Sequence, residues 1–135
     1  MKSTLLLFAF SFLLFSACKK ETQPYVVFKN SEYKELKQPS IDVQVGDHYY
    51  LIVENGYKAG TPNISIQKNN NPEQDISDSS MVKIETHGWN GQQQLTFNVL
   101  RVHLDFNANE YNSGDQLTLF SRHGSVGESV IFNIQ

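Results

Sequence analysis

The stretch LTFNVLRVHLDF (residues 95–106) decides the fold class, because apolar residues alternate with polar ones along it. Such period-two alternation is typical of a β-strand with one buried face. The alternation slips by one position at Val99 and Leu100, which are adjacent apolar residues. A slip of this kind would reverse the faces of all later side chains. The stretch therefore predicts either a β-bulge or a strand that passes from one sheet to another, and both fit a β-sandwich.

Shorter runs of the same kind recur on both sides of this stretch, separated by Gly and Asn turns. The run at 48–54 is apolar on both faces, which indicates a strand in the middle of the domain. Residues 69–80 are polar, so we expect a long exposed loop there. No amphipathic helical pattern follows residue 18. The total of about seven strands indicates an all-β domain; the other predicted strands lie at 25–28, 41–45, 64–66, 81–86, 116–121 and 129–134.

Two short phrases place a Gly-Asp pair directly before a predicted strand. One is Val45-Gly46-Asp47, and the other is SGDQLTL at residues 113–119. Both resemble a phrase found in immunoglobulin-like modules of bacterial surface and periplasmic lipoproteins. The resemblance implies an immunoglobulin-like antiparallel β-sandwich over residues 25–135 and a location in the cell envelope. It implies no enzymatic activity.

The N-terminus has the pattern of an export signal. Lys2 is followed by an apolar run at 5–15, and then by the small residues Ser16 and Ala17. The run is too short to cross a bilayer, which takes about 20 residues, and suits the core of a signal peptide. Cys18, the only cysteine of the chain, follows directly. An ordinary secretory signal with an incidental cysteine, or an uncleaved anchor, are the alternatives.

The segment Phe15-Ser16-Ala17-Cys18 resembles the lipobox of bacterial lipoproteins, in particular those of Bacteroidetes-type bacteria. The resemblance implies that residues 1–17 are removed and that the Cys18 thiol carries a diacylglyceryl group. Residues 18–24 then form a polar tether between the lipid and the domain. We expect the protein to be held at the outer membrane by this lipid. Surface-exported lipoproteins of that bacterial group tend to carry an acidic cluster after the cysteine. This chain has Lys19, Lys20 and a single Glu21 there, so the resemblance favours the periplasmic leaflet over the cell surface.

Composition excludes several other classes of protein. The chain has 135 residues, enough for one domain, and a formal net charge of −3. It has no long basic run, so a nucleic-acid partner is not expected. A single cysteine permits no intramolecular disulfide. The domain must therefore be held together by burial and hydrogen bonding alone.

The search for catalytic and metal-binding patterns favours a protein that is not an enzyme and has no cofactor. No Gly-x-Ser-x-Gly elbow occurs, and the four histidines lack the spacing of a zinc site. Asp105, Asn107 and Asn109 have the alternation of a calcium loop and are its candidate ligands. The EF-hand pattern needs Gly at its sixth position and Glu at its twelfth, where this chain has Glu110 and Gln116. A polar turn is the alternative.

Candidate ligand contacts are of two kinds. Aromatic residues on predicted loops, Trp89, Tyr57 and Tyr111, are candidate stacking groups for a sugar or a peptide. Arg101 and His103 share one face of a strand with Asp105, which indicates either a solvated face or a ligand-contacting patch.

The function that these patterns favour is a non-enzymatic envelope lipoprotein that binds or scaffolds other macromolecules, a protein or a glycan. A carbohydrate-binding accessory module of a polysaccharide-uptake system is the alternative. A small hydrolase or inhibitor is less well supported, because no activated nucleophile can be named.

Overall fold

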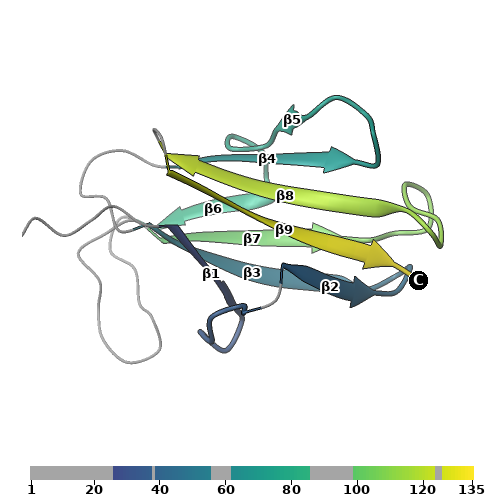
Figure 1. Cartoon of the computed structure of the whole chain (residues 1–135), viewed down its shortest axis with the longest axis horizontal. Helices are drawn as coiled ribbons and strands as arrows, with labels where there is room; N and C mark the ends of the chain where they lie inside the picture. Colours follow the sequence, from purple (N-terminus) through teal and green to yellow (C-terminus); the bar gives the residue numbers. More distant parts are fainter. Residues whose placement is uncertain (1–25, 38, 56–61, 86–98, 124–125) are drawn as a thin grey trace, which may run out of the picture.

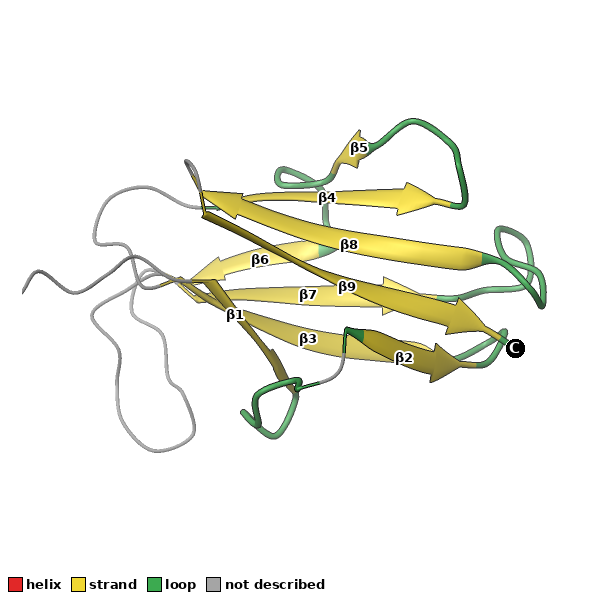
Figure 2. Ribbon diagram, in the orientation of Figure 1, coloured by secondary structure: helices red, strands yellow, loops and turns green. Residues whose placement is uncertain are grey.

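The fold is taken from a computed structural model, which describes residues 26–37, 39–55, 62–85, 99–123 and 126–135. Nine strands and no helix occur in these residues, and the strands form two sheets that face each other (Figures 1 and 2). The strands are β1 (Val26–Asn30), β2 (Ser40–Val43), β3 (His48–Asn55), β4 (Asn63–Lys68), β5 (Gln74–Asp75), β6 (Val82–Glu85), β7 (Val99–Asp105), β8 (Gln116–His123) and β9 (Val126–Ile134).

The order of strands in the two sheets is that of an immunoglobulin domain. The first sheet has the order β1-β3-β7-β6, which corresponds to A-B-E-D, and the second contains β9-β8-β4, which corresponds to G-F-C. Two short strands extend the second sheet at its edges, β2 beside β9 and β5 beside β4. The β2–β9 pairing is parallel and the other strand pairings are antiparallel. The predicted immunoglobulin-like β-sandwich is therefore confirmed, with nine described strands in place of about seven.

The hydrophobic core lies between the sheets and receives every second residue of their central strands. Antibody domains link the strands that correspond to β3 and β8 by a disulfide. Here both strands contribute aliphatic residues instead, Leu51 and Val53 from β3 and Leu117 and Leu119 from β8. The bulkiest fully buried side chains also include Ile64, Ile76, Leu100, Leu104, Phe106, Phe132 and Ile134.

The slip in alternation at Val99 and Leu100 has a simpler cause than a bulge. From Val99 to Asp105, β7 keeps an unbroken register with β3, and its pairing with β6 over Val99–Val102 is also regular. Leu100 faces the core, whereas Val99 faces outward and is buried with Ile52 beneath Tyr33. The small cluster on the outer face thus accounts for an apolar residue at position 99. Residues 95–98 lie outside the described part of the chain.

The segment at 69–80 is not the fully exposed loop that its polarity predicted. β5 pairs with β4, and Ile76 follows it with only 2% of its surface exposed. The Ile76 backbone N–H donates to the Ile64 carbonyl at 2.9 Å, which fixes the segment against β4. One buried isoleucine in a polar stretch is enough to attach that stretch to the core.

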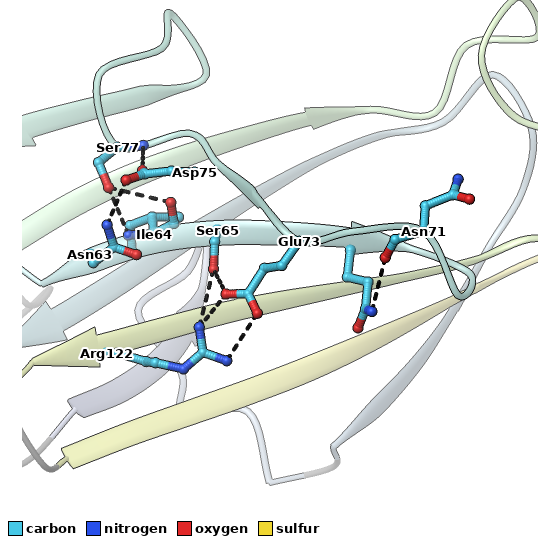
Figure 3. Close-up of polar contacts among 9 residues, drawn as sticks. Asn63, Ile64, Ser65, Asn71, Glu73, Asp75, Ser77 and Arg122 are labelled. Carbon is cyan, nitrogen blue, oxygen red and sulfur yellow. Dashed lines mark hydrogen bonds and ion pairs between the residues drawn. The ribbon is translucent and has the colours of Figure 1, made fainter.

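Polar contacts hold the same segment from outside (Figure 3). Asn63 donates to the Asp75 carboxylate at 2.8 Å, and the Ser77 hydroxyl accepts from the Ile64 N–H at 2.9 Å. Glu73 forms an ion pair with Arg122 of β8 and accepts a hydrogen bond from Ser65. These hydrogen bonds from Arg122 and Ser65 lower the pKa of the Glu73 carboxyl below its ordinary value of 4.5.

The two Gly-Asp phrases form two turns with the same geometry. Gly46 and Gly114 have φ angles of 96° and 95°, in the region that favours glycine. The carboxylates of Asp47 and Asp115 accept hydrogen bonds from backbone N–H groups three residues earlier, at 2.8 Å and 2.9 Å. β3 and β8 each begin at the next residue. The phrase is therefore a turn in which aspartate satisfies the backbone just before a strand starts.

Candidate functional site: the outer face of the first sheet

The outer face of the first sheet carries two neighbouring rows of side chains that run across its strands. In one row, Lys29, Ile52, Arg101 and Lys83 are successive partners on β1, β3, β7 and β6. In the next row, Tyr50 of β3 is the partner of His103 on β7. Side chains two residues apart on a strand share a face, so both rows point away from the core. We call them the cationic row and the aromatic row.

The aromatic row is a stack of rings that sequence alone did not indicate. Tyr50 and His103 lie 4.4 Å apart between ring centroids with an interplanar angle of 5°, and His48 stacks on His103 at 5.2 Å. His48 Nδ1 and His103 Nε2 are 2.9 Å apart, so one ring nitrogen donates and the other accepts. His48 Nε2 lies 3.9 Å from the carboxylate of Asp105. The stack is thus fixed at its histidine end, while Tyr50 remains 57% exposed.

Tyr33, from the connection between β1 and β2, positions Arg101 in the cationic row. The Arg101 guanidinium lies 5.5 Å from the Tyr33 ring centroid and donates a hydrogen bond to its hydroxyl. Tyr33 has a positive φ of 61°, held by a tight turn in which its N–H donates to the Asn30 carbonyl at 2.9 Å. The ring also packs against the small cluster of Ile52 and Val99. Arg101 is therefore held by a cation–π contact and a hydrogen bond together.

A shallow hollow of about 280 Å³ lies on this face. Its floor includes Ile52, and its lining combines the Tyr50–His103 stack with Arg101 and Lys83. A wider hollow of about 520 Å³ adjoins it at His103 and Met81 and extends toward Asn107. The face can therefore accept a group that is apolar on one side and negatively charged on the other.

The opposite sheet has no such arrangement among the described residues of its outer face. Arg122, its prominent cation, is paired with Glu73 (Figure 3). Its guanidinium carbon also lies 4.4 Å from the centroid of the Phe120 ring. Of the two large apolar residues that are exposed in the described part of the chain, Tyr50 lies on the outer face of the first sheet. Ile84, at 47%, is the partner of Leu100 and lies on the inner side of the edge strand β6.

The predicted ligand contacts are distributed unevenly. Arg101 and His103 do lie together on one face, beside the hollow. Tyr111 is only 8% exposed, packs edge-on against Phe106 at 5.4 Å and has the Lys68 amine over its ring. This burial raises the pKa of the Tyr111 hydroxyl, and the ring contributes mainly to packing against Phe106.

Three predicted residues, Cys18, Tyr57 and Trp89, lie outside the described residues.

The candidate calcium ligands are part of a local turn. The Asn107 side-chain oxygen accepts a hydrogen bond from the Asn109 N–H at 3.1 Å, and the Asn107 carbonyl accepts from the Tyr111 N–H at 3.0 Å. Asp105, in contrast, is on the outer face of β7 near His48. Nowhere in the described ranges do three or more His, Cys, Asp or Glu side chains form a group that could hold a metal ion.

The residues missed by sequence reasoning are Tyr50, His48 and Tyr33. Tyr50 belongs to the run at 48–54, whose apolar residues on both faces predicted a strand in the middle of the domain. β3 is indeed central in its sheet, but only Tyr49 of its two tyrosines points inward, where it packs against Phe132. Tyr33 lies 68 positions from Arg101, so no local pattern links them.

Within the described residues, no helix is long and apolar enough to cross a membrane. No protein-family model matches the chain, and no curated protein matches it in sequence.

Proposed function

We propose that the protein is a non-enzymatic lipoprotein of the cell envelope. In this proposal, Cys18 carries the lipid, and the immunoglobulin-like domain holds a partner macromolecule against the outer face of its first sheet. The N-terminal pattern of Lys2, the apolar run and Cys18 supports the anchoring. The arrangement of the two rows supports the binding face.

The observation that carries the binding proposal is the exposure of Tyr50. A tyrosine that is 57% exposed, with its ring stacked on His103 beside a hollow, contributes little to the core. Tyrosine and arginine are the residues that most often dominate binding energy at interfaces, because they combine large contact area with directed polar groups. Tyr50 and Arg101 line the same hollow.

The openness of the face argues for binding rather than catalysis. The side chains of His48 and Asp105 are 53% and 47% exposed. Acid–base and electrostatic catalysis are strongest where water is excluded and the dielectric constant is low. An open pair on the surface of a sheet lacks that advantage, whereas an extended macromolecule can lie across the sheet.

A carbohydrate-binding accessory module is the second candidate function. It is favoured by the Tyr50–His103 stack, because an aromatic ring beside hydrogen-bonding groups suits the apolar face of a sugar ring.

A photo-crosslinking experiment tests the binding face. The full-length protein is expressed in its native cells with p-benzoylphenylalanine in place of Tyr50. The matched control has the same amino acid in place of Thr118, which points outward from β8 on the opposite sheet. We expect a macromolecule to be captured from position 50 and not from position 118. Capture from both positions alike, or from neither, would contradict the proposal.

A further inference from the structure

We infer that the hollow between the cationic and aromatic rows binds a polysaccharide that carries carboxylate groups. The inference rests on the proposed function and names the chemistry of the partner. Sugar rings would lie against Tyr50, and their carboxylates would meet Arg101 and Lys83.

The first argument is the direction of the two rows. Neighbouring strands lie about 4.8 Å apart, and residues two apart on a strand lie about 7 Å apart. The rows are therefore parallel tracks separated by roughly the width of one sugar ring. The rows run across the sheet from the end of β1, next to Ser31, to Lys83 on β6, and both of these residues line the hollow. A linear polymer can follow this course, with one side toward each row.

The second argument is charge. The whole chain has a formal net charge of −3, yet Arg101 and Lys83 are direct partners across β7 and β6. Lys29, in the same row, is neutralised by its ion pair with Glu54. The described residues that line the hollow include Arg101 and Lys83 and no aspartate or glutamate, so the hollow attracts an anion. The planar guanidinium of Arg101 suits a carboxylate in particular.

The third argument is the exposed ring of Tyr50. One face of that ring is stacked on His103, and the residue also lines the hollow. The π-face of an aromatic ring is electron-rich and attracts the slightly positive C–H groups on the flat side of a pyranose. The Tyr50 hydroxyl and the imidazole edges supply hydrogen-bonding groups next to that contact.

The fourth argument separates a polysaccharide from an acidic peptide. Peptides that bind sheets in extended form add to an edge, where backbone N–H and C=O groups pair with them. The hollow lies on a sheet face and is lined by side chains from the two central strands and their neighbours. A peptide laid there would leave much of its own backbone without partners. The hydroxyl groups of a saccharide also need partners, but each can both donate and accept and can rotate toward the side chains that line the hollow.

The experiment measures binding of the full-length lipidated protein in detergent micelles by isothermal titration calorimetry. The probes are polygalacturonate and alginate, with fully methyl-esterified polygalacturonate as the neutral analogue and poly-L-glutamate as the acidic peptide. We expect at least one carboxylated polysaccharide to bind, and esterification or 0.5 M salt to weaken binding about tenfold or more, as for charge-assisted contacts.

Variants assign the binding to the hollow. Tyr50→Ala and Arg101→Gln should each weaken binding about tenfold, the usual size of a hot-spot loss. Arg101→Lys, which keeps the charge and loses the planar fork, should fall between Arg101→Gln and the wild type. Lys37→Gln removes an equal charge on the connection between β1 and β2, outside the hollow, and should bind as the wild type does. Unchanged thermal unfolding of each variant shows that it folds.

The outcomes separate this inference from the proposed function. Binding of poly-L-glutamate alone, or equal binding of the esterified and free polysaccharide, would overturn the inference. So would failure of both carboxylated polysaccharides to bind while the crosslinker at position 50 still captures a partner, and the proposed function would then stand. Absence of both polysaccharide binding and crosslinking at position 50 would overturn both.

Discussion

Replacement of Ile76 by alanine should destabilise the domain strongly, although Ile76 lies in a polar stretch. Its side chain is 2% exposed and belongs to the main core cluster. Alanine removes three carbon atoms, which at about 0.8 kcal/mol each corresponds to about 2.4 kcal/mol of lost transfer free energy. The remaining cavity adds to this, so we expect a loss of about 3 kcal/mol. For a domain of this size the melting temperature should fall by roughly 10 °C.

Equilibrium urea unfolding, followed by circular dichroism, measures this change as a lower midpoint with an unchanged slope. Ile76→Val, which keeps most of the side chain, should lose only about 1 kcal/mol. Asp78→Ala, at an exposed position two residues away, should stay within about 0.5 kcal/mol of the wild type. If Ile76→Ala were as mild as Asp78→Ala, the segment would be the exposed loop that its polarity predicted, and the structural reasoning would be refuted.

Three further predictions concern a charge pair, a turn and the lipid. Because the pKa of Glu73 is lowered, its pairing with Arg122 stabilises the fold above pH 4.5, and this stabilisation is lost as the pH falls through the lowered pKa. Urea midpoints measured at a series of pH values should therefore fall less steeply at acid pH in Arg122→Gln than in the wild type. Gly114→Ala should cost about 1 to 3 kcal/mol, because a φ of 95° strains any side chain, and a wild-type melting temperature would disprove this. A clickable fatty-acid analogue should label the wild type but not Cys18→Ser; equal labelling would exclude the lipid anchor.

The fold class could be predicted from the sequence because it depends on local patterns. The alternation in residues 95–106 and in the neighbouring runs shows which residues are buried, and burial on one face is what a sandwich requires. The Gly-Asp phrases predicted where strands begin, since a residue with positive φ followed by an aspartate forms the same turn in either place. These are interactions between residues only a few positions apart.

The candidate site could be predicted only in part. Arg101 and His103 were identified because they share a strand face, which period-two alternation fixes. Tyr50 was not identified, since the sequence does not show which of two adjacent tyrosines faces the core. Tyr111 was expected on an accessible loop, yet the turn at Asn107 directs it under Lys68.

The sequence by itself determined most of the strands, the two Gly-Asp turns and the N-terminal export pattern, because hydrophobic periodicity and turn chemistry act over short distances along the chain. Only the tertiary structure decided that Tyr50 meets His103, that Lys83 stands beside Arg101, and that Tyr33 covers Ile52. Each of these contacts depends on which strands become neighbours and in what register. That choice is made by packing of the whole core, so no local stretch of the sequence contains it.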